Sequence, residues 1–215
     1  MARWSAFLVP TVSIAIACSS ATNPTPAPAA SSNAQDAAPA AEPDAGNPYP
    51  EGPYGNTTGT VLGDQEFAGY YRTETTGLAT ASTYEPLRFS DLRTKATVKY
   101  ALVHTSAYWC GICKASVAEL VKAYPTYADK AIFVDILVEG ATPDDTSTKT
   151  QLDSWAKNLK VPYTVMRDPD GVSFRTQREI GPRKTLLIVE LQTMQIIYRI
   201  ADDHEAALAK LKSLN

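Results

Sequence analysis

VKYALVHTSAYWCGICKASVAELV, residues 98–121, joins a strand pattern to a helix pattern and is the clearest indication of the fold. Its first part, residues 98–105, is a mostly apolar run that predicts a buried strand. The apolar residues that follow have the spacing of one helix face: Val117, Leu120, Val121 and Tyr124. Between the expected strand and the expected helix stands the sequence Trp109-Cys110-Gly111-Ile112-Cys113. A cysteine pair at such a junction is a candidate reactive site.

Two cysteines separated by two residues can close a small disulfide and open it again. If the helix begins at Cys110, the unpaired N–H groups and the positive end of the helix dipole favour a thiolate at that sulfur. A thiolate is the species that attacks another disulfide. Cys110 and Cys113 therefore favour dithiol–disulfide exchange.

The sequence on either side of this stretch alternates between strand and helix patterns, which predicts an α/β fold. Residues 131–138 form an apolar run interrupted only by Asp135, as expected for a central strand buried on both faces. The other expected strands are 67–71 and 85–89, forming an N-terminal hairpin, then 163–166, and 185–189 with 195–198, forming a terminal hairpin. A parallel start and a hairpin finish imply a mixed sheet with helices on both faces.

Two further helices are expected after residue 140. Leu152, Trp155, Ala156 and Leu159 give one apolar stripe, which Thr146 or Ser147 would cap. The last helix would begin after a cap at Asp202 or Asp203 and turn its apolar residues inward: Ala207, Leu208, Leu211 and Leu214.

The N-terminus is typical of an export signal. Arg3 supplies a positive start, and residues 7–17 are an apolar segment too short to remain as a membrane-spanning helix. Small residues before Cys18 indicate a bacterial lipoprotein, in which that cysteine is acylated, although Ala15-Ile16-Ala17 also fits ordinary cleavage to a soluble secreted form. We expect a signal peptide over 1–17, a lipidated Cys18 with a disordered Ala/Pro-rich tether over 18–53, and one domain over 54–215.

Composition excludes several classes of function. The net charge of −3 and the absence of a Lys/Arg run argue against a nucleic-acid partner. Three cysteines are too few for a disulfide-stapled scaffold, so the domain must be held together by apolar burial. No cofactor is expected.

On the strand, the Trp109–Cys113 motif and the terminal hairpin, the chain resembles thioredoxin-fold proteins, and among them exported, membrane-tethered thioredoxins of the TlpA type, grouped with the redoxin-domain proteins. The resemblance covers about residues 54–215 and implies a three-layer α/β/α fold with an added N-terminal hairpin. It implies that Cys110 is the attacking, partly exposed thiol, that Cys113 is the buried resolving thiol, and that the two form a disulfide. Trp109 would shape the surface that the partner meets. Implied partners are thiols or disulfides of exported proteins and a membrane electron donor of unknown identity.

Two positions depart from the pattern of this family. The family has a carboxylate or Asn six residues before the first cysteine, where this chain has His104, which could exchange a proton with Cys113 or could be a core histidine bonded to backbone. The family places a cis-proline before the strand at 185–189. Lys184 occupies that place here, so either Pro182 is the cis-proline or the substrate groove is altered.

Other interpretations remain open beside this one. A peroxiredoxin needs a Pro and a Thr or Ser where this chain has Val103 and Ala107. No zinc site is expected, since His204 is far from His104 and the cysteine pair, although two thiolates could carry copper(I). A membrane-tethered docking domain with a permanently closed disulfide is the non-enzymatic alternative, because exported compartments are oxidising.

Overall fold

The computed structural model describes residues 49–169 and 180–214. The expected signal peptide over 1–17, the lipidated Cys18 and nearly all of the tether lie outside the described residues, and the boundary at residue 54 stays a prediction. In the described part, no helix combines the length and the apolar character that crossing a membrane requires.

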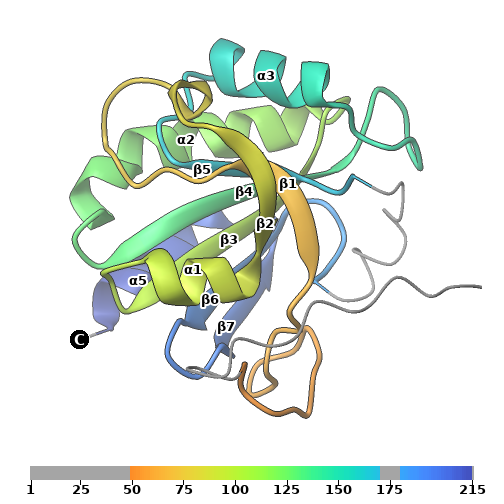
Figure 1. The fold of residues 1–215 in the computed structure, drawn as a ribbon. Coiled ribbons are helices and arrows are strands. Elements are labelled where there is room, and N and C mark those ends of the chain that lie inside the picture. Colours follow the sequence, from red (N-terminus) through yellow and green to blue (C-terminus); the bar gives the residue numbers. More distant parts are fainter. Residues whose placement is uncertain (1–48, 170–179, 215) are drawn as a thin grey trace, which may run out of the picture. The chain divides into compact units, whose positions relative to one another are not determined.

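Seven strands of the described residues form one mixed sheet in the order β2-β1-β5-β4-β3-β6-β7 (Figure 1). The strands are β1 (Glu66–Tyr70), β2 (Tyr84–Arg88), β3 (Tyr100–Ala107), β4 (Ala131–Glu139), β5 (Thr164–Arg167), β6 (Thr185–Glu190) and β7 (Gln195–Ala201). β4 is parallel to both of its neighbours, β3 and β5, whereas all other pairs are antiparallel. Both expected hairpins are confirmed, and the first extends the sheet by pairing β1 with β5.

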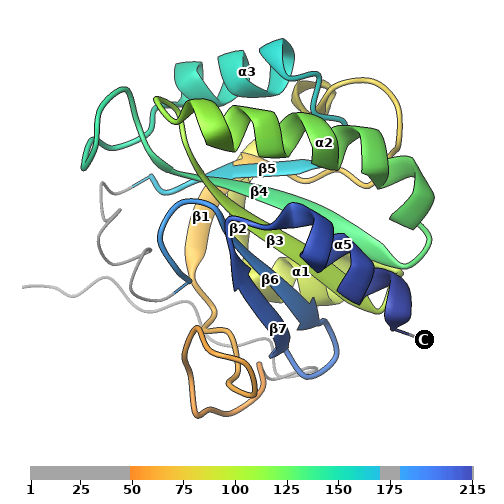
Figure 2. The ribbon, with the colours of Figure 1, turned by 180° about the vertical axis from the view of Figure 1, so that it is seen from behind.

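Helices cover both faces of this sheet, as expected (Figures 1 and 2). They are α1 (Phe89–Lys95), α2 (Gly111–Tyr127), α3 (Lys149–Asn158) and α5 (His204–Ser213), with a short 3-10 helix, η1 (Ala79–Ala81). The buried apolar residues of α2, α3 and α5 join one core cluster, and those of α1 join the other. The α/β class, the mixed sheet and the layers on both faces are therefore confirmed.

The structure corrects two details of the expected helices. Thr148, rather than Thr146 or Ser147, caps α3. Its hydroxyl accepts the backbone N–H of Gln151, and the side-chain oxygen of Gln151 accepts the backbone N–H of Thr148. Ser147 is buried instead and donates to the carbonyl of Leu137. Helix α1, which the sequence pattern did not indicate, follows β2 directly and is held by Asp91, which accepts the N–H of Arg88. Asp203 caps α5 as expected, since it accepts the N–H of Ala206.

Gly69 allows β1 to approach β5, and this predicts a large effect of a single methyl group. A Cβ atom at Gly69 would lie 2.1 Å from the carbonyl oxygen of Val165 and 2.7 Å from the Cα of Met166. Both atoms belong to the backbone of β5, so neither can move away without disturbing the strand pairing. We expect Gly69→Ala to lower the free energy of unfolding by about 2–3 kcal/mol in denaturant titrations. Gly63→Ala, with nothing within 4 Å of its added Cβ, is the matched control. A loss equal to that of the control would contradict the prediction.

Candidate redox site

Cys110 and Cys113 form a disulfide at the start of α2. Cys110 is the N-cap residue of this helix, and its sulfur accepts the backbone N–H of Cys113 at 3.2 Å. This is where the helix supplies unpaired N–H groups and the positive end of its dipole. The expected pair, its bond and its position at the helix terminus are therefore present, and the same N–H can stabilise a thiolate on Cys110 after reduction.

The structure corrects the expected exposure of Cys110. Cys110 is 2% exposed and Cys113 is fully buried, whereas Ile112 between them is 62% exposed. The Cys110 sulfur is turned inward to bond with Cys113, and both cysteines belong to the core cluster beneath α2. In the disulfide form the two cysteines thus differ little in exposure, and Ile112 is the residue of the motif that projects outward.

His104 lies beneath this region and is bonded to a carboxylate rather than to backbone. Its Nδ1 atom lies 2.8 Å from Oδ1 of Asp135, and both side chains are 1% exposed. In the tautomer with the proton on Nδ1, this contact is a hydrogen bond that His104 donates to the Asp135 carboxylate. The Nε2 atom is buried and has no hydrogen-bond partner in the described part of the chain. His104 is therefore a paired, buried histidine that keeps one unused ring nitrogen.

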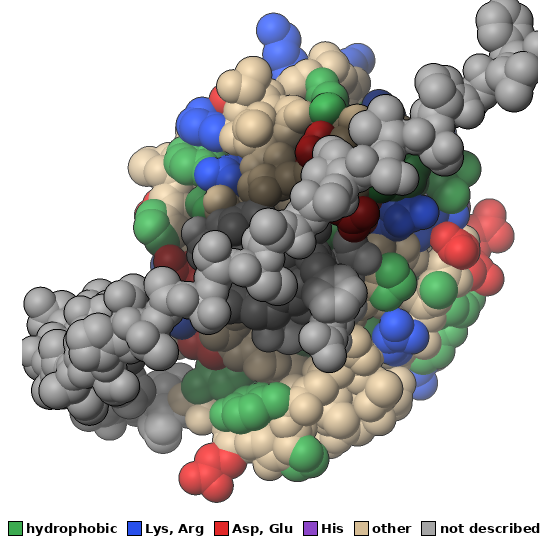
Figure 3. Space-filling view, turned by 90° about the vertical axis from the view of Figure 1, so that its right-hand side faces the viewer, with side chains coloured by type: hydrophobic (Ala, Val, Ile, Leu, Met, Phe, Trp, Pro, Cys, Tyr) green, Lys and Arg blue, Asp and Glu red, His purple; other side chains and the backbone are tan. Residues whose placement is uncertain are grey.

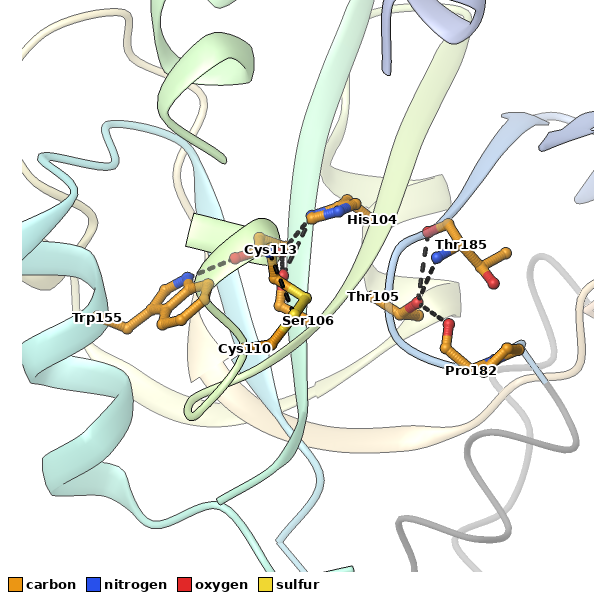
Figure 4. Close-up of polar contacts among 9 residues, drawn as sticks. His104, Thr105, Ser106, Cys110, Cys113, Trp155, Pro182 and Thr185 are labelled. Carbon is orange, nitrogen blue, oxygen red and sulfur yellow. Dashed lines mark hydrogen bonds and ion pairs between the residues drawn. A yellow bond between two sulfur atoms is a disulfide. The ribbon is translucent and has the colours of Figure 1, made fainter. Parts of the chain in front are cut away.

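Asp135 is the centre of this buried network, and Figure 4 labels its partners His104, Ser106 and Trp155. Besides His104, the Ser106 hydroxyl donates to Oδ1 at 2.6 Å and the Trp155 indole N–H donates to Oδ2 at 2.6 Å. The donors come from β3 and α3, and the carboxylate comes from β4. Three partners satisfy the hydrogen-bonding capacity of this buried side chain. Burial, and after it the negative charge of Asp135, raise the pKa of the nearby Tyr163 phenol well above its usual value, so Tyr163 stays neutral.

Strand alternation places this network on the same side of the sheet as the cysteines. His104 is the direct partner of Asp135 in the parallel β3–β4 pair. Side chains two residues apart on a strand share a face, and Leu102 and Leu137 belong to the core cluster that contains Cys113. The His104–Asp135 pair therefore lies on the sheet face that α2 covers, with Ser106 one step closer to the motif.

Trp109 is held beside the motif by contacts on its edge and its face. Its indole N–H donates to Oε2 of the buried Glu139 at 2.8 Å. The guanidinium carbon of Arg183 lies 4.5 Å from the ring centroid. Trp109 is half-buried, and its expected contact with a partner protein stays a prediction.

Pro182 is not a cis-proline. The cis peptide bond of the described residues is Gly52–Pro53, so the Gly181–Pro182 bond is trans. Lys184, directly before β6, instead adopts a left-handed backbone conformation with φ 62°. The loop is held by Thr105, whose hydroxyl donates to the carbonyl of Pro182 at 2.5 Å and accepts the N–H of Thr185 at 3.1 Å (Figure 4). Hydrogen bonds from β3 thus shape this loop, and the alternative of an altered substrate groove is the one that remains.

Four contributors to the site were not chosen from the sequence: Asp135, Ser106, Trp155 and Arg183. Asp135 carried the clearest signal, as the single charge in an otherwise apolar central strand, because a buried charge needs partners. Among residues 49–169 and 180–214, no cluster of three or more His, Cys, Asp or Glu side chains could hold a metal ion.

Comparison with known proteins establishes the fold. No protein-family model matches the chain, and no curated protein matches it. Peroxidoxin BcpB from Mycobacterium tuberculosis superposes with a TM-score of 0.54 at 16% identity, over 74% of this chain and 99% of that one. The thioredoxin domain of a thiol-disulfide oxidoreductase from Bacteroides vulgatus has a TM-score of 0.53 at 13% identity, over 74% and 99%. The reduced 2-Cys peroxiredoxin of Plasmodium vivax has a TM-score of 0.54 at 9% identity, over 73% and 80%.

The chain therefore has the thioredoxin fold that thiol-disulfide oxidoreductases and peroxiredoxins share. Within this fold it carries a C-x-x-C disulfide at the start of α2, above a buried carboxylate–imidazole pair.

Proposed function

We propose that this protein is a thiol–disulfide oxidoreductase that acts on exported proteins through Cys110 and Cys113. The observation that carries the proposal is the position of Cys110 as the N-cap of α2, where its sulfur accepts the N–H of Cys113. This arrangement stabilises the thiolate that exchange requires. Peroxidase activity is not proposed, because Val103 and Ala107 stand where the peroxiredoxin motif needs Pro and Thr or Ser.

In the reducing direction the reaction has two steps. The Cys110 thiolate attacks one sulfur of the substrate disulfide; that S–S bond breaks and the other substrate sulfur leaves as a thiolate, which takes a proton. Cys113 then loses its proton, its sulfur attacks that of Cys110, and the second substrate thiol is released. Two electrons and two protons pass from the protein dithiol to the substrate, and the Cys110–Cys113 disulfide forms. A dithiol donor at the membrane must reduce it again, and the opposite direction uses the same steps reversed.

The second step needs an acceptor for the proton of Cys113, because this residue is fully buried. Asp135 and His104 are two buried titratable groups on the sheet face that α2 covers. Asp135 holds the imidazole through Nδ1, and Nε2 is the unused basic atom of the pair. We assign to this pair the transient storage of the proton, with Ser106 as the hydroxyl between the pair and the motif.

The cellular setting rests on the N-terminal sequence. Residues 1–17 support export, and Cys18 supports a lipid anchor in a bacterial membrane, followed by a tether that leaves the domain in the periplasm or outside the cell. A TlpA-type lipoprotein fits these features. Its partners would be cysteines of exported proteins and a membrane-bound donor of electrons.

One observation favours the alternative of a docking domain with a static disulfide. Both sulfurs are buried, Cys110 at 2% exposure included. An inaccessible disulfide resists attack by an external thiol, so exchange requires that the surface around Ile112 and Pro182 opens or that the partner reaches the Cys110 sulfur from that side.

The reduction potential of the pair separates the two functions. We expect the full chain, equilibrated in glutathione or dithiothreitol buffers and quenched with a thiol-alkylating reagent, to give a potential of about −120 to −270 mV, the range of exchange catalysts. A value well below about −300 mV, together with no alkylation of Cys110 at neutral pH after reduction, would identify a structural disulfide and support the docking domain.

A further inference from the structure

A pocket of about 250 Å³ opens beside the motif, lined by Ile112, Pro182, Arg183, Lys184 and Asp202. Ile112 is the exposed residue between the two cysteines, so whatever enters this pocket contacts the motif at that residue. The remaining lining residues come from the loop before β6 and from the end of β7.

The charges in this pocket do not balance. Lys184 Nζ lies 3.1 Å from Oδ1 of Asp202, so these two residues neutralise each other. Arg183 is exposed and makes no ion pair with the described residues; its contact is with the ring of Trp109. Stacking on an aromatic ring leaves the guanidinium charge in place. Among the described residues that line the pocket, Arg183 therefore carries the one positive charge that no ion pair compensates.

The position of Arg183 is fixed by both of its neighbours. The carbonyl of Pro182 accepts the Thr105 hydroxyl, and the N–H of Lys184 donates to the carbonyl of Thr105 at 2.5 Å. The carbonyl of Lys184 in turn accepts the N–H of Asp202 at 2.9 Å. A guanidinium can keep its flat face on Trp109 while the N–H groups at its edge donate to a carboxylate. Arg183 is thus a preorganised donor for an anionic group.

On the described surface that is visible in Figure 3, Lys and Arg side chains are interspersed with Asp and Glu. No broad field of one sign is present on the described part of this face, so selectivity for charge has to come from a local contact rather than from long-range steering.

We propose that this pocket selects substrates that carry an acidic residue close in sequence to the reactive cysteine, with its carboxylate on Arg183 and an apolar neighbour on Ile112; this rests on the proposed exchange function. The occupant is an extended acidic segment of an exported protein. A local charge contact of this kind acts on partner choice and on the register in which the substrate binds.

The test compares two peptides that each contain one internal disulfide and differ only in the residues beside the first cysteine, aspartates in one and lysines in the other. The second-order rate constant for oxidation of the reduced full chain is measured for each. We expect the acidic peptide to react about threefold to tenfold faster at low salt, and the ratio to approach one at about 0.5 M NaCl. Because the ratio compares two substrates on one protein, any change in the reactivity of Cys110 cancels.

Arg183→Gln should bring this ratio close to one, and Arg183→Lys should retain part of the preference. Lys122 is a surface cation on α2, so Lys122→Gln is the control and should leave the ratio unchanged. An unchanged ratio in Arg183→Gln, or equal rates with the unaltered protein, overturns the proposed selectivity while exchange itself stands. Failure of both peptides to oxidise the reduced protein overturns the exchange function, and the selectivity with it.

Discussion

Cys113→Ser is expected to stop the exchange cycle at the mixed disulfide. Cys110 keeps its place at the N-terminus of α2 and still attacks the substrate. A serine hydroxyl at position 113 cannot attack the Cys110 sulfur and displace the substrate thiol, so the mixed disulfide accumulates. Cys110→Ser removes the attacking sulfur, and we expect turnover to fall by at least about a thousandfold with no adduct formed. Acid quenching followed by alkylation and mass spectrometry distinguishes the two variants.

These variants should remain folded, so their phenotype reports on chemistry. The disulfide joins residues three positions apart, and closing so short a loop contributes about 2 kcal/mol in the chain-entropy model. Circular dichroism provides the control for folding, and Lys122→Gln provides the control for activity. Normal turnover by Cys113→Ser would refute the two-step mechanism, as would an adduct on Cys113 in Cys110→Ser.

Asp135→Ala is expected to be the most destabilising substitution in the site. It removes the carboxylate that accepts from His104, Ser106 and Trp155, and it leaves three buried donors without their partner. Each orphaned donor is costly, and breaking a buried pair on one side costs more than removing both members. We expect a loss of about 3–5 kcal/mol in the free energy of unfolding, measured by denaturant titration.

Two further variants keep this prediction testable. Asp144→Asn changes an exposed aspartate in a turn, at φ 65°, and should cost less than about 0.5 kcal/mol, because Asn tolerates this conformation. The double variant His104→Leu with Asp135→Ala should lose less than the sum of its single variants, since each residue is the other's partner. Additive losses would mean that the two side chains are not coupled.

Most elements of the fold could be predicted because their signals are local. The apolar run at 131–138, the helix stripe beginning at Val117 and the cap at Asp203 all depend on residues close together in the chain. Helix α1 could not be predicted from the sequence pattern, because it is short and begins directly at the end of β2, where no loop separates the two patterns. The cap of α3 was misplaced because Thr146, Ser147 and Thr148 are chemically similar, and only packing assigns Ser147 to the interior.

The candidate site was predictable only in its cysteines and their neighbours. His104 was recognised by its distance from Cys110, but its partner is 31 residues away in the chain. That pairing depends on the parallel register of β3 and β4, to which the whole of both strands contributes. Arg183 was missed for a related reason, since a loop residue acquires its role only when the fold sets it against Trp109.

Apart from α1, local residue patterns predict the order of the main elements, the cysteine pair at a strand–helix junction and the helix terminus beside Cys110, because periodicity and capping act over a few residues. Only the folded chain shows that Asp135 pairs with His104, that the bond before Pro182 is trans and that Cys110 is buried. These outcomes follow from strand register and close packing, where many distant residues must fit together at once.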